Sequence, residues 1–78
     1  MDLAEARKTF PPIWVVYDHP RDYPDKWVVR VWYGEVSEPD CTVHDSREDA
    51  RESISSRGGG MCFAPYLNDD PCIAEWWI

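Results

Sequence analysis

Three runs of β-branched and aromatic residues constrain the fold of this chain more than any other feature. They occupy residues 13–17, 26–33 and 72–78 and read IWVVY, KWVVRVWY and CIAEWWI. Such residues favour extended backbone, and prolines, glycines or aspartates stand close to the ends of these runs. A chain of 78 residues has room for one domain. The runs therefore predict a single small domain built around a sheet.

One helix is expected between the second and third runs. Ser46 has the chemistry of a helix N-cap, and Ala50 and Ile54 stand four residues apart, which gives the segment a narrow apolar stripe. Gly58–Gly60 is a stop signal for a helix. We therefore expect a helix from about Arg47 to Ser56.

The remaining segments complete an α+β prediction. A short strand is expected around residues 41–44, and another over residues 61–66 that pairs with the last run. Residues 1–12 are expected to form an N-terminal arm with one or two helical turns, followed by a single α+β domain at 13–78. The predicted architecture is a small antiparallel sheet of about four strands with one helix packed on one face, in the order ββ(β)αββ.

Both sets of alternating side chains are apolar in the three runs, so each sheet face carries bulky groups. One helix of about ten residues covers only one face. The second face is then expected to expose an aromatic patch, with Trp32 and Trp77 as apolar anchors for a partner. Two alternatives remain open: the arm, through Leu3 and Phe10, covers this face, or two copies associate weakly through it. The chain is accordingly expected to be a monomer or a weak homodimer.

Charge is distributed unevenly along the chain. The net charge is −7 and the isoelectric point is near 4.5, which argues against direct binding to nucleic acid or to an anionic membrane. Seven acids and only two arginines lie between residues 35 and 52. Carboxylates spaced along such a segment can imitate phosphates for a protein with a positive groove. The candidate phosphate surrogates are Glu35, Glu38, Asp40, Glu48, Asp49 and Glu52. The alternative is an ordinary solvated acidic face.

The sequence holds no nucleophile elbow, phosphate-binding glycine loop or paired-cysteine zinc signature. We therefore expect a protein that is not an enzyme and has no cofactor. A metal site remains a weaker alternative: Cys41 and His44 have ligand spacing, and His19 with Asp18 or Asp45 would have to complete the site.

Three cysteines at irregular spacing suit a reduced compartment better than a disulfide framework. Cys62 and Cys72 could approach each other across a hairpin, but nothing in the sequence demands a bond. The first residues lack the apolar stretch of a signal peptide, and no apolar run is long enough to span a membrane. These features predict a cytoplasmic location.

Residues 13–78 carry a resemblance that composition does not show. The stretch IWVVYDHPRDYPDKWVVRVWYG, with DSREDARESI and the ending NDDPCIAEWWI, resembles a group of small proteins encoded by bacteriophages and prophages. In that group a Tyr-Asp-His-Pro turn follows the first strand, and a DDP turn precedes a tryptophan-ending C-terminus. The present chain departs from the group in its N-terminal arm and its additional cysteines.

The size and charge of the chain are also similar to those of type I anti-CRISPR proteins, especially inhibitors of type I-C systems. That similarity implies a phage-derived inhibitor that acts as an acidic DNA mimic on a Cascade-like complex in the host bacterial cell. The implied partner is a protein with a basic surface, such as a Cascade subunit. The first alternative is a phage protein that binds another target through the tryptophan-rich face, and the second is the small metal-binding protein.

Overall fold

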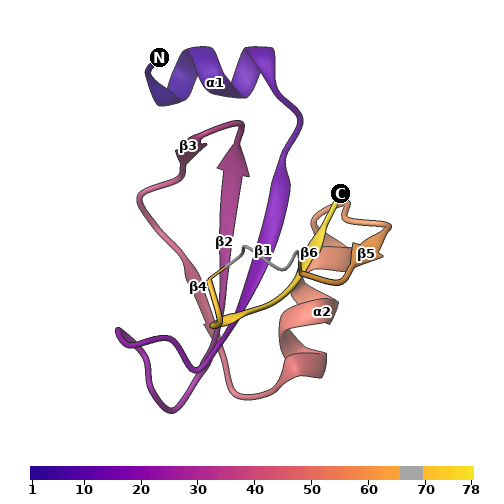
Figure 1. The fold of residues 1–78 in the computed structure, drawn as a ribbon. Helices are drawn as coiled ribbons and strands as arrows, with labels where there is room; N and C mark the ends of the chain where they lie inside the picture. Colours follow the sequence, from indigo (N-terminus) through magenta and orange to yellow (C-terminus); the bar gives the residue numbers. More distant parts are fainter. Residues whose placement is uncertain (66–69) are drawn as a thin grey trace.

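The computed structural model describes residues 1–65 and 70–78, which form two helices and a six-stranded antiparallel sheet (Figure 1). The elements, in chain order, are α1 (Leu3–Thr9), β1 (Ile13–Asp18), β2 (Trp27–Tyr33), β3 (Val36–Ser37), β4 (Thr42–His44), α2 (Arg47–Ser56), β5 (Cys62–Phe63) and β6 (Ile73–Trp77). The α+β class and the antiparallel pairing are confirmed. The strand count is higher than predicted, and α1 is a second helix.

The sheet is centred on β1, which pairs with β2 on one side and with β6 on the other. The outer edge of β2 is shared: β3 pairs with its Tyr33 end, and β4 pairs with its Trp27 end. β5 forms the opposite edge through its pairing with β6. The strand predicted over residues 61–66 is therefore only two residues long, and Tyr66 itself lies outside the described residues.

The connection between β1 and β2 is a compact turn, as its prolines and aspartates predicted. The His19 backbone N–H donates to the Lys26 carbonyl at 3.1 Å, and the Tyr23 N–H donates to the Pro20 carbonyl at 2.9 Å. His19 has a φ of 50°, and its ring hydrogen-bonds to Asp18. The Asp-His-Pro motif therefore organises the hairpin that joins the two central strands.

The core lies between the sheet and α2, on what we call the helix face. Trp14 pairs with Val31 and Val16 with Val29, so these four side chains point to the same side of the sheet. They form one buried cluster with Ala50 and Ile54 of α2. The bounds of α2 match the prediction, and the Ser46 hydroxyl accepts the Asp49 backbone N–H at 3.1 Å, as an N-cap should.

The N-terminal arm packs on one end of the sheet. Figure 1 shows α1 lying across that end, beyond the tip of β2. Ala6 is fully buried, and the Arg7 guanidinium stands 6.0 Å from the centre of the Tyr33 ring. Phe10 lies so close to Gly34 that an added Cβ there would be 2.9 Å from its ring. These contacts join the arm to β2 and to the turn before β3.

Trp32 and Trp77 lie on opposite faces of the sheet, which corrects the expectation that they share the second face. Trp77 pairs with Trp14 and packs against the buried cluster on the helix face. Trp32 pairs with Ile13 on the other side and donates through Nε1 to the Tyr17 hydroxyl at 3.3 Å. Both alternating sets of β6 are apolar, so only its register with β1 decides which set meets α2.

Candidate functional site

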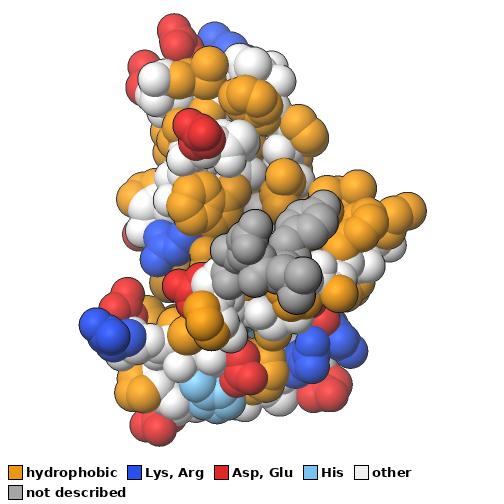
Figure 2. Space-filling model, viewed as in Figure 1, with side chains coloured by type: hydrophobic (Ala, Val, Ile, Leu, Met, Phe, Trp, Pro, Cys, Tyr) orange, Lys and Arg blue, Asp and Glu red, His pale blue; other side chains and the backbone are white. Residues whose placement is uncertain are grey.

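The six candidate acids form two separate groups. Glu35, Glu38 and Asp40 flank β3, whereas Glu48, Asp49 and Glu52 belong to α2. β3 pairs with the Tyr33 end of β2, and β4, which leads into α2, pairs with the Trp27 end. The paired positions of β3 and β4 are three to six residues of β2 apart, which is roughly 10–20 Å at about 3.3 Å per residue. Figure 2 likewise shows acidic side chains at both ends of the visible face, with basic ones among them. The six acids therefore do not form one continuous row.

Glu38 has a structural contact that makes it a poor phosphate surrogate. Its Oε1 accepts a hydrogen bond from Arg7 at 2.9 Å and another from the Tyr33 hydroxyl at 3.2 Å. The side chain is only 25% exposed. Glu38 thus ties α1 to the sheet, while Glu35 and Asp40 remain exposed beside it. This group offers fewer free carboxylates than the sequence suggested.

Glu75 is the functional group that the sequence analysis missed. It projects from β6 towards α2 and is 2% exposed. Arg51 binds it with two hydrogen bonds of 2.8 Å, and Arg47 adds a third contact at 3.1 Å. Trp77 donates to the same carboxylate at 3.2 Å. The lone acid within the apolar run CIAEWWI was the available signal, because a buried carboxylate needs cationic or N–H partners.

The hydrogen bonds from Arg51 are the main reason why the pKa of Glu75 falls from 4.5 to about 2, against the opposing effect of burial. Glu75 therefore stays ionised at neutral pH. The pKa of Arg51 is raised by the same contact. The two arginines that the sequence places among the acids of α2 are thus paired with a strand residue beneath the helix.

The carboxylates of α2 consequently face solvent with little compensation. Glu48, Asp49 and Glu52 are all exposed. Asp49 accepts a hydrogen bond from His44 Nδ1, with the two heavy atoms 2.8 Å apart. Among residues 1–65 and 70–78, neither Glu48 nor Glu52 has an ion pair. Side chains four apart on a helix are roughly 5–6 Å apart at Cβ, so these two charges are neighbours. We call Glu48, Asp49 and Glu52 the α2 acidic group.

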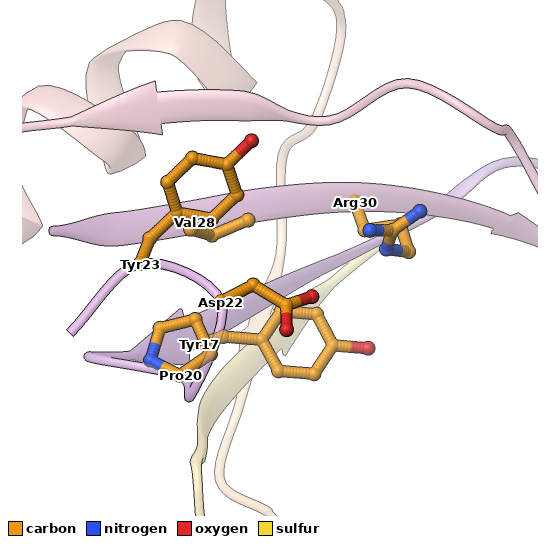
Figure 3. A pocket seen from close by; sticks show the side chains of 6 residues that line it. All are labelled: Tyr17, Pro20, Asp22, Tyr23, Val28 and Arg30. Carbon is orange, nitrogen blue, oxygen red and sulfur yellow. The ribbon is translucent and has the colours of Figure 1, made fainter.

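The second face carries a small hollow beside the β1–β2 turn (Figure 3). Its volume is about 160 Å³, and the lining residues are Tyr17, Pro20, Asp22, Tyr23, Val28 and Arg30. Arg30 donates to the Glu38 carbonyl at 3.1 Å. Sites for whole small-molecule ligands are usually about 300 Å³ or more, so this hollow suits a single side chain of a partner better than a substrate.

The predicted metal ligands do not come together. Both ring nitrogens of His44 are engaged, Nδ1 with Asp49 and Nε2 with the Thr42 hydroxyl, each at 2.8 Å. In the described part of the chain, no three His, Cys, Asp or Glu side chains are grouped as a metal site requires. All three cysteines are free; Cys62 pairs with Trp77 at one end of β6, whereas Cys72 precedes its other end.

Comparisons with known proteins leave the resemblance to phage proteins as a hypothesis. No protein-family model, curated protein or solved structure gives a significant match to the chain. Within the described residues, neither helix has the length and apolar character that crossing a membrane requires.

Proposed function

We propose that this chain is a phage-derived anti-CRISPR protein that inhibits a Cascade-like complex by binding its positive DNA-recognition surface through α2. It would act without catalysis, in the cytoplasm of the host cell. The observation that supports the proposal best is the exposure of the α2 acidic group while both arginines of the same helix bind Glu75. The similarity in size and charge to type I anti-CRISPR proteins indicates the class of partner, and the exposed carboxylates of α2 indicate the binding surface.

The α2 acidic group has the properties that a phosphate surrogate needs. Its three carboxylates stand on a helix whose Ala50 and Ile54 are anchored in the core, so the charges are presented on a rigid support. Each carboxylate can accept charge-assisted hydrogen bonds from Lys or Arg of a partner. Binding through such pairs is expected to be fast and to weaken as the salt concentration rises.

Neutralising the group tests the proposal. Glu48→Gln, Asp49→Asn and Glu52→Gln are combined, and binding to type I surveillance complexes purified from a host strain is measured at several salt concentrations. The expected result is loss of binding with the domain still folded. The matched control combines Glu5→Gln, Glu35→Gln and Asp40→Asn, which removes the same charge from exposed positions outside α2. Equal effects of the two variants would reduce the proposal to a net-charge effect and refute it.

The second face supports another candidate function, binding of a different protein target through aromatic side chains. Trp32 is half-buried there, and it is held by Tyr17 beside the small hollow. Trp32→Ser tests this candidate: lost binding with an unchanged salt dependence would favour it over mimicry. Trp77→Ser is unsuitable for this test, because Trp77 packs on the helix face and its removal would disturb the core.

A further inference from the structure

We propose that Glu75 is a positioning residue that sets the charge of the α2 surface by holding Arg47 and Arg51 beneath the helix. This inference rests on the proposed function of α2, and it extends that function to a residue that does not itself contact the partner. Glu75 belongs to β6, far from α2 in the sequence, so the surface depends on a tertiary contact.

The geometry supports the positioning role. Arg51 meets the two carboxylate oxygens of Glu75 through Nε and Nη2, both at 2.8 Å, which is the bidentate arrangement. Arg47 contacts Oε2 through Nη2 at 3.1 Å, and its guanidinium also lies 5.6 Å from the centre of the Trp27 ring. Arg47 has this second support, whereas the described hydrogen bonds of Arg51 all go to Glu75.

Both arginines are close enough to solvent to change sides. Their side chains are 39% and 42% exposed, while that of Glu75 is 3% exposed. Without the negative charge of Glu75, the Arg51 guanidinium can rotate outward to Glu48, which lies three residues before it on the same helix. Counted over the three acids, the two arginines and residue 75, the formal charge is −2 in the wild type and −1 in Glu75→Gln.

Three variants separate this mechanism from a simple effect of net charge or stability. Glu75→Gln releases both arginines. Arg47→Gln with Glu75→Gln leaves the net charge of the protein unchanged but still releases Arg51. Arg47→Gln, Arg51→Gln and Glu75→Gln together remove the whole cluster, so no arginine remains to be released. The matched control is Glu5→Gln, an exposed carboxylate on α1 that belongs to no candidate binding site.

Binding to an oligo-arginine peptide is measured for each variant by calorimetry at low salt, with circular dichroism to confirm folding. We expect Glu75→Gln to lower the affinity for the peptide about tenfold, and the net-neutral double variant to lower it about fivefold. The reason is that a released arginine pairs with a carboxylate of α2 that the peptide would otherwise bind. The triple variant should bind at least as tightly as the wild type, because its net charge is one unit more negative. Glu5→Gln should change the affinity less than about twofold.

The outcomes distinguish this inference from the proposed function. If the folded double variant binds as tightly as the wild type, or the triple variant binds as weakly as the double one, the positioning role of Glu75 is refuted, although the α2 acidic group can still be the binding surface. If neutralising Glu48, Asp49 and Glu52 leaves oligo-arginine binding unchanged, the proposed function itself fails. Should Glu75→Gln alone not fold, the double and triple variants still decide the matter.

Discussion

Replacement of Glu75 by Gln is expected to cost the fold about 3 kcal/mol at neutral pH. The carboxylate is 2% exposed, and its contacts with Arg51 lower its pKa from 4.5 to about 2. At about 1.4 kcal/mol for each pKa unit, that fall corresponds to about 3 kcal/mol of folding free energy. Breaking a buried ion pair by removing one partner costs about 3–5 kcal/mol in other proteins, which agrees. A domain of this size has about 4–12 kcal/mol in total, so the loss is large.

The pH dependence identifies the cause. Because the pKa of Glu75 is lower in the folded state than in the unfolded state, its contribution is complete above pH 4.5 and is lost as the pH falls towards 2. Urea unfolding, followed by tryptophan fluorescence, is compared for the wild type and Glu75→Gln across that range. The difference in unfolding free energy should shrink from about 3 kcal/mol to near zero. A difference below about 1 kcal/mol at neutral pH, or one that does not change with pH, would refute the reasoning.

Two further substitutions test how α2 is held. Gly59→Ala should destabilise the domain by about 1–3 kcal/mol, because an added Cβ would stand 2.3 Å from Ile54 Cγ2. Gly60→Ala is the control, since an added Cβ there would have no atom within 4 Å. Equal urea midpoints for the two variants would contradict the prediction. Ser46→Ala should cost about 1 kcal/mol through loss of the N-cap hydrogen bond. Ser55→Ala, exposed within the same helix, should have little effect in the same assay, so similar losses for both serines would show that the cap is not responsible.

Elements with a strong local signal were predicted closely. α2 has the expected bounds, because an N-cap serine, an apolar stripe and a run of glycines act within the helix itself. The central strands also match, since their β-branched and aromatic residues favour extended backbone wherever they pack. β3 was not predicted, because a two-residue strand has no periodicity and forms only when the turn at Gly34 returns the chain to β2.

The candidate site was predicted less completely than the fold. The sequence identified the α2 acidic group, because charge density is a property of composition. It did not show that Glu38 binds Arg7, because the partner lies 31 positions away in the chain. For the same reason the sequence did not show that both arginines of α2 bind Glu75.

Composition and local pattern thus determine that this chain is acidic, that it forms strands and one main helix, and where α2 begins and ends. Only the tertiary structure decides which side chains share a face and which charges remain free. Trp77 packs on the helix face because β6 adopts one register against β1, and Arg51 turns inward because that register places Glu75 beneath α2. Alternation and net charge are the same for either face, whereas the contacts that choose between them join residues far apart in the sequence.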